Sequence, residues 1–215
     1  MDDDPKRGAD FTLGEGSTEA EAVERFYDDW AETYDETLRG WRYRAPERTA
    51  AALAPHLATG ARVLDVGCGT GMFAEALAAE GDFRLDGLDI SGASLEIAAR
   101  TGRYDRLIRH DLQRLPLPVA TDACDAAASV GVLTYVADVE GLMRDVVRCV
   151  RPGGAVAFTQ RSDRWESAGF PEMLARLEEE GLWTPLQVGE PRPYLPGNRE
   201  FGERVGVVHV LCRID

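Results

Sequence analysis

Residues 63–71 read Val-Leu-Asp-Val-Gly-Cys-Gly-Thr-Gly, a short apolar run that leads directly into three closely spaced glycines. The run predicts a buried strand of a parallel sheet over 62–66. Glycines allow the backbone to pass close to a ligand, and they leave amide N–H groups exposed where the next helix begins. That helix is expected over 72–80, with Gly81 as its stop.

Acidic residues flank these glycines on both sides. Asp89 ends the next predicted strand, 18 residues after Gly71, and a carboxylate there accepts hydrogen bonds from a ribose diol. Asp65, two residues before the first glycine, suits a cationic group better than a pyrophosphate. A nicotinamide fold requires G-x-G-x-x-G, whereas the sixth position here is Met72. The pattern therefore fits S-adenosylmethionine, which combines ribose, adenine, an amino-acid tail and a sulfonium.

Strands and helices alternate along the middle of the chain. Strands are expected over 62–66, 83–88, 106–109, 125–130 and 155–159, and helices over 72–80, 94–100 and 139–150. Alternation at this pitch indicates βαβ units and an α/β fold with a parallel sheet. This alternation ends after the fifth strand. A helix is then expected over 172–180, an irregular or hairpin-like stretch over 185–199 and a final strand over 205–212. That strand is expected to be antiparallel, because a parallel pair needs a long crossover.

The first third of the chain predicts a polar tail followed by helices, without the strands of the middle segment. Residues 1–17 are polar and glycine-rich, which predicts a flexible tail. A helix is expected from Thr18, where Thr18 and Glu21 have the spacing of a capping box. An aromatic stripe along that helix fits either a core-facing side or a lid over a small-molecule pocket. Pro46 opens a second helix, so we expect a helical cap over 18–58 and the main domain over 59–215.

Composition narrows the range of partners. The chain has 38 acidic and 24 basic residues, a net charge of −14, which disfavours nucleic acid and weakly favours a cationic or zwitterionic ligand. Its four cysteines are too widely spaced for a metal site or a disulfide framework, so a reduced, cytoplasmic protein is expected. No secretory signal and no apolar run long enough for a membrane span is present, and either a monomer or a homodimer is compatible with the sequence.

Five segments together resemble class I S-adenosylmethionine-dependent methyltransferases. Residues 63–71 are similar to motif I of that family and residues 87–91 to its second motif; the segments 110–112, 122–133 and 150–154 then follow in family order. The resemblance covers roughly residues 60–160. It implies a Rossmann-like three-layer αβα sandwich whose seven-stranded, mostly parallel sheet has the order 3-2-1-4-5-7-6, with the last strand antiparallel.

The amino-terminal segment adds a second resemblance. Residues 26–35, Phe-Tyr-Asp-Asp-Trp-Ala-Glu-Thr-Tyr-Asp, and residues 43–46, Tyr-Arg-Ala-Pro, resemble the small methyltransferase-like family of the Williams–Beuren region. The same lead-in is more loosely similar to quinone C-methyltransferases and bacterial natural-product methyltransferases. These likenesses imply a cap helix over the cofactor, with Tyr34 and Arg44 near its methionine end.

The family resemblance also implies roles for individual residues. The methionine and ribose side would be bound by Asp65, Gly67, Cys68, Gly69 and Gly71. Asp89 would hold the ribose diol, Ile90 would pack on adenine, Asp111 and Leu112 would bind the adenine edge, and Ser129 would border the methyl donor with Gly131.

Methyl transfer depends mainly on alignment of the acceptor and exclusion of water, so no nucleophilic residue is required. A hydroxyl acceptor would need a general base, and the weak candidates are His209, Asp163 and Tyr135. No metal site is expected. The acceptor is expected to be a small molecule, methylated on oxygen, nitrogen or carbon. Its pocket would be lined by Tyr27, Trp30, Tyr34, Trp41, Tyr43, Tyr135 and Trp165.

Three alternatives stay open. The first is an S-adenosylmethionine-binding protein that does not methylate, either a sensor or an enzyme that uses the sulfonium electrostatically. The second is methylation of protein or RNA, although the net charge of −14 disfavours RNA. The third is a nicotinamide dehydrogenase, which would bind NAD.

Overall fold

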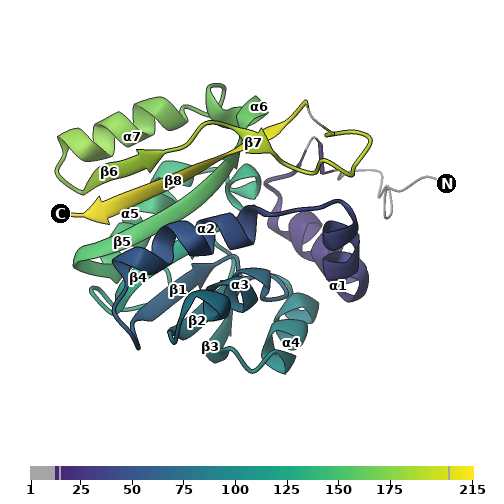
Figure 1. The fold of residues 1–215 in the computed structure, drawn as a ribbon, viewed down its shortest axis with the longest axis horizontal. Helices are drawn as coiled ribbons and strands as arrows, with labels where there is room; N and C mark the ends of the chain where they lie inside the picture. The colour runs from purple at the N-terminus through teal and green to yellow at the C-terminus, as the bar shows by residue number, and fades with distance from the viewer. Residues whose placement is uncertain (1–12, 15, 203) are drawn as a thin grey trace.

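The computed structural model describes residues 13–14, 16–202 and 204–215, so most of the predicted tail over 1–17 lies outside the described residues. The strands are β1 (Arg62–Val66), β2 (Arg84–Asp89), β3 (Tyr104–Arg109), β4 (Cys124–Ser129), β5 (Val150–Arg161), β6 (Trp183–Val188), β7 (Arg192–Pro193) and β8 (Gly206–Ile214). They form one sheet in the order β3-β2-β1-β4-β5-β8-β6, with β7 paired to β8 (Figure 1). Apart from the two-residue β7, this confirms the expected order.

The helices are α1 (Ala20–Gly40), α2 (Ala45–Leu53), α3 (Met72–Glu80), α4 (Gly92–Arg100), α5 (Val139–Cys149), α6 (Ser162–Trp165) and α7 (Phe170–Glu179). β1 to β5 run parallel, and β8 is antiparallel to both β5 and β6. None of the helices in the described part of the chain has the length and apolarity to cross a bilayer.

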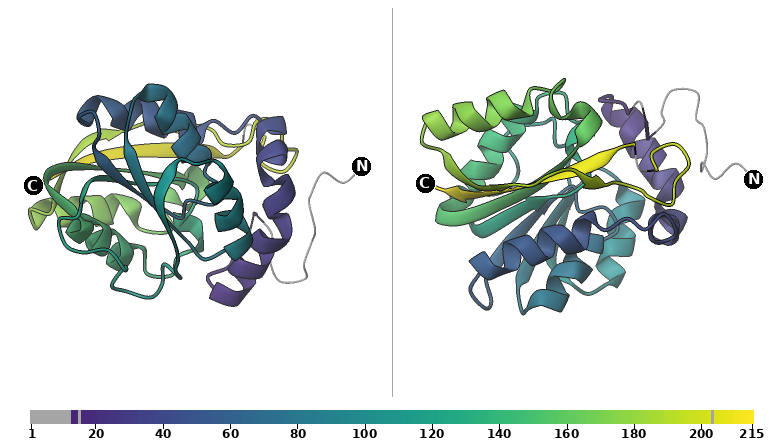
Figure 2. Two further views of the ribbon diagram at one scale, coloured as in Figure 1. Left: turned by 90° about the horizontal axis from the view of Figure 1, so that it is seen from below. Right: turned by 45° about the horizontal axis from the view of Figure 1, so that its top comes forward.

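Alternate strand residues bury opposite faces of the sheet. Val63 of β1 packs in one hydrophobic cluster with Leu53 of α2 and Leu77 of α3. Its neighbour Leu64 packs in the other cluster, which contains Leu142 of α5 and further residues of α5 and α7. The period of two follows from strand geometry, and it produces the three layers visible in Figure 2. Helix α1 lies outside these layers, across the end of the sheet where β1 to β5 finish (Figure 1).

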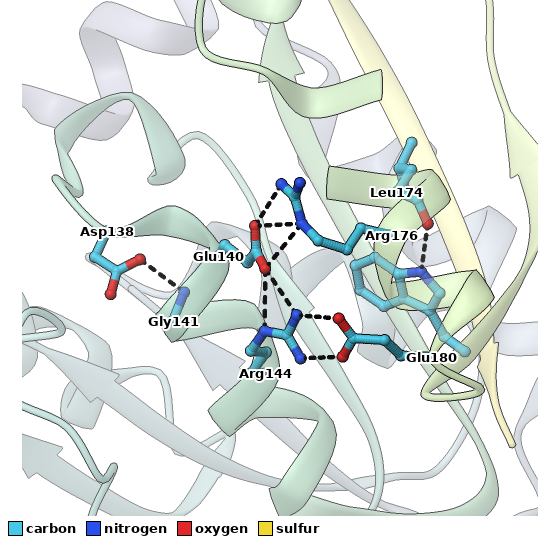
Figure 3. Close-up of polar contacts among 8 residues, drawn as sticks. Asp138, Glu140, Gly141, Arg144, Leu174, Arg176 and Glu180 are labelled. Atoms are coloured by element: carbon cyan, nitrogen blue, oxygen red, sulfur yellow. Dashed lines mark hydrogen bonds and ion pairs between the residues drawn. The ribbon is translucent and has the colours of Figure 1, made fainter. Parts of the chain in front are cut away.

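Helices α5 and α7 are joined by an ion-pair network on their outer surface. Glu140 of α5 accepts hydrogen bonds from Arg144 at 2.8 Å and from Arg176 of α7 at 2.8 Å, and Arg144 also pairs with Glu180 at 2.5 Å (Figure 3). These arginines hold the pKa of the Glu140 carboxyl below its ordinary value. The network is partly exposed to solvent, so it contributes little to stability.

Three local expectations differ from the structure. The residue preceding α1 is Glu19, and no side chain caps the helix, so the predicted capping box at Thr18 and Glu21 does not form. β6 occupies part of the stretch expected to be irregular, and Pro185 is tolerated there because β6 lies at the sheet edge. The short helix α6 has no counterpart in the sequence analysis, since four residues give no periodic signal.

Candidate functional site

A large cavity lies at the carboxyl ends of the parallel strands, beneath α1. It measures about 710 Å³, including open space at its mouth. Between β1 and β4 the strand order reverses direction, and ligands of open α/β sheets bind at such a switch point. We call this space the first cavity. It is lined by Tyr27 and Tyr34 of α1, by Gly67, Gly69, Asp89 and Ile90, and by Asp111 and Leu112.

The glycine loop after β1 forms the floor of the first cavity. Gly67, Gly69 and Gly71 have φ values of +77°, +52° and +99°, in the left-handed region that favours glycine. At Gly67 a Cβ atom would lie 2.3 Å from a methyl group of Val132. Only glycine fits this position without displacing its neighbours. Gly71 directly precedes α3, so the loop presents backbone to the cavity at a helix start.

Asp89 joins the glycine loop to the end of β2. Its two carboxylate oxygens accept hydrogen bonds from the backbone N–H groups of Gly69 at 2.8 Å and Ser91 at 2.9 Å. Burial raises the pKa of Asp89, and the backbone N–H donors oppose that rise. Each oxygen keeps a further lone pair for a ligand hydroxyl. The carboxylate is therefore held rigidly at the cavity wall with acceptor capacity to spare.

Asp65 has a different environment from Asp89. It is 1% exposed and lies behind the cavity wall, where the Tyr104 hydroxyl donates to it at 2.7 Å. Burial raises the pKa of Asp65 to about 7, although the Tyr104 hydrogen bond lowers it. Cys68 and Ser129, also expected near the cofactor, are buried behind the lining, and the Ser129 hydroxyl donates to the Val66 carbonyl at 3.1 Å.

The loop after β3 supplies the side of the first cavity expected for adenine. Asp111, Leu112 and Gln113 all line it, as does Ile90. One Asp111 oxygen accepts the Gln113 backbone N–H at 3.0 Å, and the other pairs with Arg114 at 3.5 Å. The Gln113 side chain donates to the Thr18 carbonyl at 2.5 Å, which links this loop to the start of the α1 region.

Helix α1 is attached to the site by two aspartates that the sequence analysis did not single out. Asp28 accepts hydrogen bonds from the Ser91 hydroxyl at 2.6 Å and the Ala93 backbone N–H at 3.1 Å. Asp35 accepts from the Thr70 hydroxyl of the glycine loop at 2.5 Å. The acidic positions of α1 therefore bond to the loops that form the cavity floor.

The aromatic residues expected to line the acceptor pocket divide into two groups. Tyr27 and Tyr135 line the first cavity and are hydrogen-bonded to each other. Trp30 and Trp41 are buried in a separate hydrophobic cluster, and Trp165 stacks on Phe170 against the core. Arg44, expected near the methionine end, is largely exposed and pairs with Glu47 at 3.1 Å.

A smaller second cavity adjoins the first, and Gly131 and Tyr135 line both; it measures about 260 Å³ including open space, and its interior has room for little more than a water molecule. Thr159, Gln160 and Arg161 at the end of β5 line it, together with Tyr43, Thr134, Tyr194 and Val207. Gln160 and Tyr194 were not expected at the site. Gln160 directly follows a predicted strand, and Tyr194 lies in the stretch expected to be irregular or hairpin-like. Neither belongs to a sequence motif that would mark it as a site residue.

The three candidate bases occupy different environments. His209 of β8 lines neither cavity; its Nε2 atom is buried without a partner in the described structure, and burial lowers its pKa. Asp163 is paired with Arg161 at 2.5 Å. Tyr135 alone lines a cavity, and burial raises its pKa, which keeps its hydroxyl protonated.

Comparison with known proteins agrees with this geometry. A family model described as methyltransferase domain matches residues 64–158. Human methyltransferase-like protein 27 is 36% identical over 170 residues, covering 75% of this chain and 68% of that protein.

Solved structures with the same fold include an S-adenosylmethionine-dependent methyltransferase from Mesorhizobium loti, with 25% identity, a TM-score of 0.58 and coverage of 76% of this chain and 96% of that one. The cyclase SpnF, at 20% identity, has a TM-score of 0.71 and coverage of 93% and 98%. With its glycine loop, the carboxylate at the end of β2 and its strand order, the chain belongs to the class I S-adenosylmethionine-dependent methyltransferases.

Proposed function

We propose that this enzyme methylates a small-molecule acceptor at the wall that the two cavities share, while S-adenosylmethionine occupies the first cavity. The observation that carries the proposal is the shared wall: Gly131 and Tyr135 line both cavities. The second cavity itself has room for little more than a water molecule, so an acceptor would reach this wall by displacing part of that cavity's lining. In this arrangement α1 acts as the cap within the segment 18–58, whereas α2 packs on the sheet, and the region over 59–215 carries the binding loops.

The residues of the first cavity fit this cofactor. The Asp89 carboxylate has lone pairs for the ribose hydroxyls, and Gly69, where a Cβ would meet nothing within 4 Å, leaves open space at the cavity floor. Ile90 and Leu112 offer apolar surface for adenine, with Asp111 beside them. When bound, S-adenosylmethionine supplies a methyl group activated by the sulfonium. Cofactor binding at these residues is the basis of the proposal.

The chain's own contribution is to enclose and orient the reactants. Val130, Val132 and Val136 make much of the wall apolar, which excludes water. Tyr135, held by its hydrogen bond to Tyr27, stays protonated because burial raises its pKa. It can orient an acceptor as a hydrogen-bond donor, but it does not remove a proton at neutral pH. The acceptor must therefore bring its own nucleophile, such as an amine, an enolate or an acidic hydroxyl.

The test is a screen of phenolic, carboxylic, amine and quinone acceptors in which release of S-adenosylhomocysteine is measured. We expect turnover with at least one small acceptor and none with unstructured peptides, because a concave, largely apolar cavity with a few polar groups suits small molecules. Turnover with peptides alone would contradict the proposal and favour protein methylation.

A second candidate is an enzyme that binds S-adenosylmethionine without methylating. It is favoured by the second cavity, where no carboxylate or histidine is found among the described lining residues. It predicts cofactor binding without S-adenosylhomocysteine release from any acceptor, a result the same screen would record.

A further inference from the structure

We propose that residues 13–14 and 16–18, which we call the amino-terminal strap, form a gate over the wall shared by the two cavities, and that the methyl acceptor enters when the strap lifts. The inference rests on the proposed function, because it assigns the route by which the acceptor reaches that wall. Three features of the strap carry it: its anchor beside the second cavity, its contact with Tyr135 and its light attachment.

The first anchor of the strap is Arg161, at the end of β5. Its Nη1 atom donates to the Leu13 carbonyl at 2.5 Å, and its Nη2 atom donates to the Gly14 carbonyl at 3.2 Å. Arg164 also donates to the Gly14 carbonyl, at 3.4 Å. Asp163 pairs with the Arg161 guanidinium at 2.5 Å and keeps it in place. The strap is therefore fixed through its backbone carbonyls, a kind of contact that leaves no pattern in the sequence.

Beyond this anchor, the strap crosses the residue that lines both cavities. A Cβ atom on Gly16 would lie 3.4 Å from Cε1 of the Tyr135 ring and 3.6 Å from Cγ2 of Thr134. The backbone of the strap therefore lies against Tyr135 with little space between them. Since Tyr135 and Arg161 both line the second cavity, the strap contacts two of the residues that form its lining.

The other end of the strap is fixed by the loop after β3. Gln113 of that loop lines the first cavity, and its Nε2 atom donates to the Thr18 carbonyl at 2.5 Å. The Gln113 Oε1 atom accepts the Ala137 backbone N–H at 3.2 Å, so both ends of this amide are engaged. Helix α1 begins two residues after Thr18 and is bonded to the cavity floor through Asp28 and Asp35. The Thr18 end of the strap is therefore firmly held.

The Leu13 end of the strap is attached more lightly. Among residues 13–14 and 16–18, Leu13 alone is buried, at 6% exposed, in the hydrophobic cluster that contains Trp41 and Phe201. None of these strap residues belongs to a helix or a strand. Segments with few buried apolar contacts and no ladder of backbone hydrogen bonds open locally at low free energy.

The size of the second cavity gives this opening a role. An acceptor at the shared wall must displace part of the lining, because the cavity has room for little more than a water molecule. β5 and β8 are paired within the sheet, and α1 is bonded to the floor of the first cavity. The strap can lift from Tyr135 and Arg161 without disturbing either. When it closes again, it excludes water from the shared wall.

An engineered disulfide that locks the strap tests this gate. The distance of 3.6 Å between Thr134 Cγ2 and a Cβ on Gly16 brings cysteines at the two positions within reach of a disulfide. Turnover of an acceptor identified by the screen and affinity for S-adenosylhomocysteine are measured for Gly16→Cys/Thr134→Cys, oxidised and then reduced. Oxidation should lower turnover at least about tenfold, reduction should restore it, and cofactor affinity should stay unchanged.

Each single substitution, Gly16→Cys and Thr134→Cys, is the matched control for the lock. The single variants contain the same changes, including a side chain at the φ of +69° of Gly16, but they cannot form the cross-link. The four native cysteines are buried, so oxidation should leave turnover of both single variants unchanged.

The converse variant releases the strap and needs no acceptor. Leu13→Asp places a carboxylate in a hydrophobic cluster and should free this end of the strap, whereas Leu13→Met keeps an apolar side chain of similar volume. Amide hydrogen exchange over residues 131–136 is measured with S-adenosylhomocysteine bound. We expect exchange at least about fivefold faster in Leu13→Asp than in wild type, and no change in Leu13→Met.

Equal turnover in the oxidised and reduced forms, or loss of cofactor binding on oxidation, would overturn this inference and leave the proposed function intact. Unchanged exchange in Leu13→Asp would also overturn it, whether or not the disulfide forms. Failure of the wild type to methylate any acceptor in the screen would overturn the proposed function, and this inference with it.

Discussion

At the residue scale, Asp65 provides a pH-dependent test of the structure. Burial raises its pKa from 3.8 to about 7, so between these values the folded state holds a proton that the unfolded state has lost. The contribution of Asp65 to stability is therefore fully present below about pH 4 and is lost as the pH rises to about 7. The difference in pKa corresponds to about 4 kcal/mol as an upper value.

The Asn variant isolates this effect from the other carboxylates. Asp65→Asn cannot titrate, so its free energy of unfolding should rise relative to wild type as the pH increases from about 4 to 7, and the difference should then level off. Chemical denaturation of both proteins across this range measures it. A difference that stays constant with pH would mean that the Asp65 pKa is not raised.

Gly67 gives a second test, based on space. Gly67→Ala places a Cβ 2.3 Å from Val132 and retains a φ of +77°, so we expect a loss of about 2–3 kcal/mol in stability and severe loss of cofactor binding. Gly60→Ala is the matched control: its φ is +78° and its Cβ would meet nothing within 4 Å. It should cost about 1–2 kcal/mol and leave cofactor affinity unchanged. Similar cofactor affinity in the two variants would show that the Val132 contact is unimportant.

The sequence predicts some of these residues better than others. The glycines and Asp89 can be predicted because their roles depend on the backbone: a left-handed φ and a carboxylate at a strand end. The aromatic stripe of α1 cannot be resolved in the same way. Tyr27 lines the cavity while Trp30 is buried in a hydrophobic cluster, yet both fit one helical face. A position in the hydrophobic core and a position in the wall of a ligand cavity both favour aromatic side chains. The sequence alone therefore does not distinguish the two.

At the element scale, attachment of α1 to the glycine loop should control how fast the cofactor leaves. Thr70→Val removes the hydroxyl that donates to Asp35 while keeping the side-chain shape. We expect severalfold faster release of S-adenosylmethionine and a stability loss of about 1–2 kcal/mol. Stopped-flow fluorescence measures the release rate.

The control is Thr37→Val, which removes a hydroxyl that donates to the Thr33 carbonyl within α1. It should leave the release rate unchanged. Equal rates in wild type and Thr70→Val would show that the contact between α1 and the loop does not retain the cofactor.

The bounds of the helices and strands were also predicted with unequal success. The helix over 72–80 has the expected bounds because glycines mark both of its ends. The family resemblance implies a sixth strand, but the residues 185–199 predict only an irregular or hairpin-like stretch, so the bounds of β6 were not predicted. Pro185 argues against a strand there, and the place of β6 at the sheet edge permits it. Whether such a segment forms a strand depends on its pairing with another strand, here β8, and the local sequence pattern gives no information on that pairing.

At the scale of the whole molecule, the order of the sheet places the first cavity. β1 and β4 are neighbours although two strands lie between them in the chain, so the loops after β1, β2 and β4 meet at one edge. The sequence predicts this order through its resemblance to a family. It does not predict the second cavity, which joins β5 and β8 to Tyr43 and Tyr194 from distant parts of the chain.

The most direct test of the account is calorimetric titration of S-adenosylmethionine into wild type, Asp89→Ala and the exposed control Asp82→Ala. We predict one site per chain in wild type and in Asp82→Ala. Affinity should fall by at least about tenfold in Asp89→Ala, because the ribose hydroxyls lose a charged acceptor. Equal affinity in all three proteins, or no binding to wild type, would contradict it.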